Sequence, residues 1–316
     1  MTDFFSTSLK APRRSKPAEW RRQAAHSQRG LASLTLIAFS LGCPYLFAQQ
    51  KPPALRGQTQ APDSDTEKSA DNTEALQKTT ENTVASIMSV PIENKSNFNI
   101  GPFGRNQNIV NIKPLIPIQL SKRWRLIARI IQPIQWQPYL SRGHGGEFGL
   151  GDVTPTFFLS PVPRGTLAWG AGPKFIIPTA TDRILGQGKF SIGPEFALFV
   201  QPGHWTCGIL ISNVWSVAGS GGRANVNQMQ VQYFLSYRLG KGWDIATSPI
   251  VSAKWNASSG NVWTVPFGGG VGKIVRFGSR PAKVSARFYR NSVRPSGASP
   301  WGLNLQIEFL FPKRRN

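Results

Sequence analysis

The chain has 316 residues, of which 16% are charged, and its basic residues outnumber its acidic ones to give a net charge of +22. This length suits one large β domain or two ordinary domains. So large a charge predicts anionic surroundings, such as nucleic acid, lipopolysaccharide or acidic solutes. The basic residues are scattered singly through strand-like segments, however, with no recognition helix, metal finger or basic arm. We therefore expect no nucleic-acid partner.

The first 48 residues have the order of a secretory signal peptide. A basic stretch precedes the apolar run "LASLTLIAFSLGCPYLFA", and a polar segment follows. We expect cleavage after Ala48 and export from the cytoplasm. A degenerate lipobox ending at Cys43 is a weaker alternative, because Ser40 stands where Leu is expected. A retained membrane helix is also weaker, because Pro44 breaks the run.

The next segments link this leader to the rest of the chain. Residues 49–81 are polar, contain no aromatic residue and read as a disordered linker. In residues 82–93, the spacing of Val84, Ile87 and Met88 predicts a short helix or plug that ends at Pro91. A frayed N-terminal turn is the alternative for this piece.

From Asn94 the sequence becomes a succession of strand-like segments with a period of two. Tight connections such as "QPGH" alternate with a second set, several of them longer, such as "TATDRILGQGK". This alternation is typical of an all-β, up-and-down antiparallel barrel. We predict the barrel over residues 94–312, with a basic tail over 313–316. The twelve expected strands are 94–101, 107–120, 124–137, 149–160, 166–178, 189–200, 205–217, 227–238, 243–255, 262–275, 282–292 and 300–311.

The two faces of these strands indicate a membrane barrel rather than a soluble sandwich. In 189–200, Ile192, Phe196 and Leu198 share one face, which we expect to meet lipid, whereas Glu195 lies on the other. Strands of about 11–13 residues suit a tilted membrane crossing. Tryptophans lie at or near the strand ends, as in interfacial aromatic girdles.

Several segments resemble a known family. These include "GLGDVTPTFFLSP", "GAGPKFIIPTATDRILGQGKFSIGPE", "WTVPFGGGVGKI" and "WGLNLQIEFLFP", within a resemblance that spans about residues 82–312. They resemble a family of Gram-negative outer-membrane β-barrels that is often labelled "transporter" or "neuromedin U" and is similar to the family named for the MetA pathway of phenol degradation. The resemblance implies an outer-membrane barrel and suggests passage of small aromatic compounds. It fixes no residue roles.

Catalytic or metal chemistry has little support in the sequence. Beyond the leader the histidines are His144 and His204, which are not at metal-ligand spacing. We expect no cofactor, no metal and no enzymatic activity. The enzyme alternative is an outer-membrane lipase that uses Ser and His on the lipid face, but no His-x-Ser pair lies on an outward strand face.

Polar side chains on the inward parity are the candidate functional residues. They could form a pore lining or a neutralising network that fills a narrow barrel. Because basic residues dominate, we expect a conducting pore to prefer anions. The predicted lumen-lining residues are Lys113, Arg125, Arg129, Asp152, Lys174, Glu195, Gln230, Asp244, Arg287 and Glu308.

The sequence as a whole predicts a twelve-stranded outer-membrane channel for passive passage of small solutes, hydrophobic or aromatic ones among them. A closed barrel with a structural, adhesive or lipid-binding role is the alternative. The expected partners are outer-membrane lipid and lipopolysaccharide, the barrel-assembly machinery and a small-molecule solute.

Overall fold

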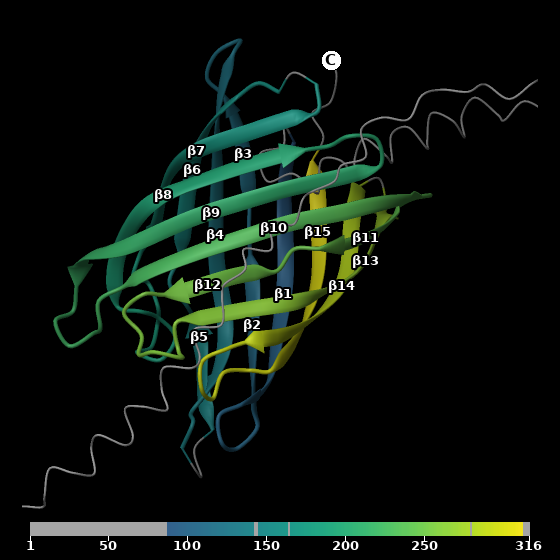
Figure 1. Ribbon diagram of the computed structural model, residues 1–316. Coiled ribbons are helices and arrows are strands. Elements are labelled where there is room, and N and C mark those ends of the chain that lie inside the picture. The colour runs from purple at the N-terminus through teal and green to yellow at the C-terminus, as the bar shows by residue number, and fades with distance from the viewer. Residues whose placement is uncertain (1–86, 142–144, 164, 279, 312–316) are drawn as a thin grey trace, which may run out of the picture. The chain divides into compact units, whose positions relative to one another are not determined.

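The computed structural model describes residues 87–141, 145–163, 165–278 and 280–311, all within one compact unit (Figure 1). Every element in these ranges is a β-strand. The strands are β1 (Met88–Ile100), β2 (Arg105–Ile112), β3 (Leu115–Gln119), β4 (Trp124–Pro138), β5 (Gly146–Leu150), β6 (Thr154–Pro161), β7 (Leu167–Ile176), β8 (Lys189–Val200), β9 (Trp205–Gly219), β10 (Asn227–Gly240), β11 (Trp243–Thr247), β12 (Ile250–Lys254), β13 (Trp263–Phe277), β14 (Arg280–Val293) and β15 (Trp301–Phe311).

The sheet closes on itself as an antiparallel barrel. Each strand pairs with its neighbour in sequence, and β1 pairs with β15 from Met88 opposite Phe311 to Phe98 opposite Trp301. The pairing of β9 with β10 completes the ring. Three strands are interrupted and appear as the segment pairs β2 and β3, β5 and β6, and β11 and β12. The barrel therefore has twelve strands, as the sequence predicts, and no edge is left unpaired.

Prolines explain two of the three interruptions. Pro114 separates β2 from β3, and Pro249 separates β11 from β12. Proline has no backbone N–H to donate, so it breaks the ladder of hydrogen bonds where it stands. The pairing with β1 nevertheless continues on both sides of Pro114. Lys113 N donates to Pro91 O at 2.9 Å, and Leu115 pairs with Ser89.

The two faces of each strand differ as the alternation predicts. Along β8, Ser191, Glu195 and Phe199 are buried, whereas Phe196 between them is exposed. The exposed large side chains of the other strands follow the same rule, so the outer wall of the barrel is apolar. Strand faces and strand order are therefore confirmed.

Aromatic side chains gather near both ends of this outer wall. At the long-loop end Phe98 stacks on Trp301 with ring centroids 4.1 Å apart, and at the short-turn end Trp205 lies 4.8 Å from Tyr237. On β9, Trp205 and Trp215 both lie on the exposed face, ten residues apart. At about 3.3 Å per residue and a tilt of about 40°, this separation corresponds to an apolar band about 25 Å tall.

The expected helix or plug over 82–93 is wrong where the structure describes it. Met88–Glu93 belong to β1 and pair with β15, and on the other side Ser89 pairs with β3 and Ile92 and Glu93 pair with β2. Strand pairing on two sides overrides the weak helical spacing of three apolar residues. The predicted leader, linker and basic tail, and residues 82–86, lie outside the described residues. Among the described residues there is no helix that is long and apolar enough to span a membrane.

Candidate functional site

The inner face of the barrel carries a charged network centred on Glu195. This carboxylate on β8 is 1% exposed and accepts two hydrogen bonds from Arg129 Nη2 of β4, at 2.9 and 2.8 Å. Thr156 Oγ1 of β6 donates a further hydrogen bond at 2.7 Å. Three strands are thus joined by side chains that point into the barrel, and the buried charge of Glu195 is neutralised.

Lys174 extends this network to the next strands. Its Nζ lies 3.5 Å from Glu195 Oε1 and donates to Ser212 Oγ of β9 at 3.1 Å and to Gln230 Oε1 of β10 at 2.7 Å. Because Lys174 is on β7 and its partners are on β8, β9 and β10, the network crosses the interior rather than following one pair of strands. We call Arg129, Thr156, Lys174, Glu195, Ser212 and Gln230 the ionic network.

An apolar layer lies on the short-turn side of the ionic network. Phe199 and Phe234 approach with ring centroids 5.1 Å apart, and the guanidinium of Arg129 lies over the ring of Phe158 at 5.5 Å. The Phe199 ring occupies the space over Gly208, where any Cβ would lie 2.3 Å from it. This layer, here called the apolar plug, comprises Leu115, Ile127, Phe158, Ala168, Ala197, Phe199, Leu210 and Phe234.

A second charged cluster lies on the wall formed by β1, β14 and β15. Glu93 forms ion pairs with Lys113 and, at 3.5 Å, with Lys95. On the same wall Lys283 Nζ lies 3.0 Å from Asp244 Oδ1 of β11. Glu308 is also buried and accepts a hydrogen bond from Gln306 at 3.3 Å. This wall therefore carries both acidic and basic side chains, several of them in ion pairs.

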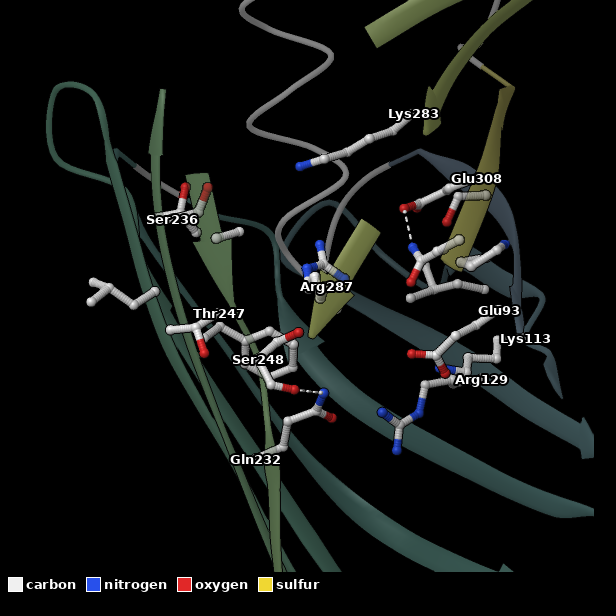
Figure 2. Close-up of a pocket in the computed structure, with 18 residues that line it drawn as sticks. Glu93, Lys113, Arg129, Gln232, Ser236, Thr247, Ser248, Lys283, Arg287 and Glu308 are labelled. Carbon is white, nitrogen blue, oxygen red and sulfur yellow. Dashed lines mark hydrogen bonds and ion pairs between the residues drawn. The ribbon is translucent and has the colours of Figure 1, made fainter. Parts of the chain in front are cut away.

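Between this wall and β10–β11 the barrel interior remains open as a cavity of about 140 Å³. Figure 2 shows Arg287 drawn between Glu93, Lys113 and Arg129 on one side and Gln232 and Ser248 on the other. Such a volume has room for on the order of ten water molecules. The interior is thus divided into a packed sector, which contains the apolar plug, and an open sector.

The inner face of β13 helps to create the open sector. Its inward positions include Gly268, Gly270 and Gly272, so neighbouring side chains can meet over it. The Lys283–Asp244 ion pair crosses β13 in this way, and a Cβ at Gly272 would lie 2.7 Å from Asp244 Oδ1 and 2.9 Å from Lys283 Cε. The glycines of the run "GGGVG" therefore leave space for charged side chains of the neighbouring strands.

Asp152 occupies a different place from the other predicted lumen residues. Its carboxylate accepts hydrogen bonds from Ala180 N at 3.2 Å and from Gln187 N at 2.6 Å. Both residues belong to loop 177–188, in which Leu185 is buried. Two carbonyl oxygens of this loop also accept hydrogen bonds from Arg223. Asp152 thus fixes the long loop at the end of the barrel.

The structure brings together most of the residues that the sequence predicts. Arg129, Lys174, Glu195 and Gln230 meet in the ionic network. Lys113, Asp244, Arg287 and Glu308 lie on or beside the second wall, while Arg125 is buried on β4, on the short-turn side of the apolar plug.

Sequence reasoning missed three interior features: Glu93, Lys283 and the apolar plug. Lys283 could have been found, because it shares the parity of Arg287 on the same strand. Glu93 falls in the segment for which the sequence predicts a helix. The apolar plug is not evident from the sequence, because a water-filled interior predicts polar side chains at the inward positions.

The described residues contain no cluster of metal-ligating side chains. No group of three or more His, Cys, Asp or Glu side chains in this part of the chain could hold a metal ion. His204 lies beside the ring of Tyr237 in a short turn, with centroids 6.1 Å apart. His144 lies outside the described residues.

These features define a closed, twelve-stranded, up-and-down β-barrel with an apolar outer wall and a charged interior. No family model matches the chain, and no curated protein matches it either. Among solved structures, it is similar to the COG4313 outer membrane channel from Pseudomonas putida F1, with 17% identity, a TM-score of 0.57, and coverage of 71% of this chain and 94% of that one.

Two further structures overlap with it less well. The NanC porin shares 10% identity at a TM-score of 0.48, with 72% of this chain and 100% of that chain covered. Outer membrane phospholipase A from Escherichia coli shares 13% identity at a TM-score of 0.38, with 72% and 90% covered. The likeness to the Pseudomonas channel is one of fold.

Proposed function

We propose that this chain is an outer-membrane channel that passes small solutes, with a preference for anions. The observation that carries the proposal is the open sector, an interior cavity lined by Lys113, Arg129, Lys283 and Arg287 but by only two acidic side chains, Glu93 and Glu308. A low-dielectric wall strengthens the field of such an excess of cations. The apolar outer wall with aromatic residues near both ends supports a membrane location.

Export to the outer membrane of a Gram-negative bacterium belongs to the same proposal. A closed barrel leaves no backbone polar group of the described strands unpaired at a sheet edge, which is the condition for crossing hydrocarbon with strands. The signal-peptide pattern of residues 1–48 and the fold shared with the Pseudomonas putida channel both support it. Lipid, lipopolysaccharide and the barrel-assembly machinery remain the proposed partners.

The experiment is a measurement of reversal potential in a salt gradient across a planar bilayer. We expect wild-type channels to favour chloride over potassium. The change Lys113→Gln removes one cation from the cavity lining and should weaken this preference. The double change Lys113→Gln/Glu93→Gln removes the same cation together with its acidic partner, so the preference should be kept. A cation-selective pore, or equal behaviour of the two variants, would contradict the proposal.

A closed barrel with a structural or lipid-binding role is the second candidate. The apolar plug and the ionic network favour it, because together they fill the sector bounded by β4 and β6–β10 with buried side chains. Protein that inserts into the bilayer yet carries no current above the lipid background would support this candidate over the channel.

A further inference from the structure

Arg287 differs from the other cationic side chains of the cavity in its ion pairing. Lys113 is paired with Glu93, Arg129 with Glu195, and Lys283 with Asp244. Within the described residues Arg287 forms no such ion pair, and its Nε, like that of Arg129, is buried without a hydrogen-bond partner. A buried guanidinium nitrogen left unsatisfied in the protein is a position where a ligand can replace the missing partner.

The charge around Arg287 limits the kind of ligand. Of the four cationic side chains in the cavity lining, Lys113, Arg129 and Lys283 already have carboxylate partners, so Arg287 is the one that can take up a further negative charge. Arg287 is close enough to Glu93 and Glu308 to interact electrostatically with both. A dianion such as phosphate would be repelled by these two carboxylates, whereas a monoanion can bind the guanidinium at lower cost.

The shape of the Arg287 guanidinium further limits the kind of anion that it can bind. Its planar fork of N–H groups matches the two oxygens of a carboxylate, which a spherical halide cannot match. Arg287 can project into the cavity because the residue paired with it on β13 is Gly270, which has no side chain (Figure 2). The positioning of the guanidinium is thus a consequence of the glycine face of β13.

The remaining walls suit an uncharged body attached to that carboxylate. Leu115 of β3 and Phe234 of β10 offer apolar surfaces, and Gln232 and Ser248 offer amide and hydroxyl groups on the same side as Phe234. The cavity of about 140 Å³ can hold one small organic molecule in place of its water.

We infer that the open sector contains a discrete binding site for a small organic monocarboxylate, held by Arg287. This inference deepens the proposed function and rests on it for its role in passage. The site recognises the carboxylate through the guanidinium fork and packs the body of the molecule against Phe234. Such a site would bind organic monocarboxylates in preference to other anions, whereas an overall positive field attracts all anions alike.

The test uses the full chain folded in detergent micelles, with benzoate as the probe and isothermal titration calorimetry as the readout. We expect saturable benzoate binding in the millimolar range, and at least tenfold weaker binding of the neutral isostere benzamide and of inorganic phosphate. Arg287→Gln should weaken benzoate binding at least tenfold. Lys273→Gln, which removes a cation from the outer wall beside Trp243, is the matched control and should bind as wild type does.

Two further variants test the site even if Arg287→Gln does not fold. Arg287→Lys retains the charge but loses the fork, so benzoate binding should weaken several-fold even if Arg287→Gln does not fold. Glu308→Gln removes a competing carboxylate and should tighten benzoate binding several-fold. Circular dichroism shows whether each variant is folded.

The inference is overturned if benzamide binds as tightly as benzoate, or if Arg287→Gln folds and binds benzoate unchanged. Conductance separates this failure from that of the channel. Wild-type protein that conducts chloride but does not bind benzoate would refute the site and leave the channel standing. Protein that binds benzoate at Arg287 without conducting would uphold the site and refute the channel.

Discussion

Arg129 and Glu195 meet inside the barrel although their strands, β4 and β8, are three steps apart around the sheet. The N–O distance of 2.8 Å and the near-complete burial of the carboxylate make this a desolvated ion pair. Such a pair links parts of the wall that are not adjacent, in a way that backbone hydrogen bonds between neighbouring strands cannot.

Removing one partner of this pair should destabilise the barrel strongly. Glu195→Gln leaves Arg129 and Lys174 buried without their counter-charge, and we expect a loss of about 3–5 kcal/mol in the free energy of unfolding. Urea unfolding in lipid vesicles, followed by tryptophan fluorescence, measures it. Arg129→Met/Glu195→Met removes both charges and should recover a large part of the loss. If the double variant were no more stable than Glu195→Gln, the ion pair would not be the cause.

Opening the apolar plug should change both stability and conductance. Phe199→Ala removes a buried ring from the interior, and we expect a cost of about 3–5 kcal/mol and a larger single-channel conductance. Phe196→Ala on the same strand is the control, because that ring lies on the outer wall and does not border the interior. Equal conductance of Phe199→Ala and wild type would mean that the plug does not limit passage.

The face assignment can be tested with one matched pair of arginine substitutions. Ile211 lies near the middle of β9 on the exposed face, and Ser252 of β12 pairs with the inward Gln230. Ile211→Arg should therefore cost about 2–4 kcal/mol on folding into a bilayer. Ser252→Arg should be tolerated in the aqueous interior. Similar costs at both positions would refute either the faces or the membrane location.

The closed barrel should also be visible in its resistance to denaturation. Folded protein in detergent should give a circular dichroism spectrum of β-structure and migrate differently on gels before and after boiling, because unfolding a closed sheet disrupts all strand pairs together. A mainly helical spectrum, or a chain that stays soluble and monomeric without detergent, would be incompatible with the fold.

The fold was largely predictable because its signals are local. A period of two fixes the faces of β8 and β10 from the residues alone, and the alternation of turn lengths gives the strand order. The helix expected near Met88 is wrong because β1 pairs with a strand on each side. Its partners are Phe311 and neighbouring residues of β15, and Ile112 and neighbouring residues of β2. No local sequence pattern reveals these distant partners.

The interior was only partly predictable. Parity identifies that Arg129, Lys174 and Glu195 point inward, but it does not tell which of them meet. Contacts across the interior depend on the stagger of the strands and on the diameter of the barrel, which are properties of the closed ring. For the same reason the sequence does not reveal that Arg287 forms no ion pair of its own within the described part of the chain.

The pairing of β1 with β15 has a consequence for how the protein is made. Met88 finds its partner Phe311 more than two hundred residues further along the chain, and until then β1 keeps one open edge. The barrel can therefore close only after β15 has been synthesised. A chain that lacks β15 would expose two unpaired strand edges, which promote aggregation. Only when β15 has paired with β1 does the sheet close and leave no strand edge of the barrel open.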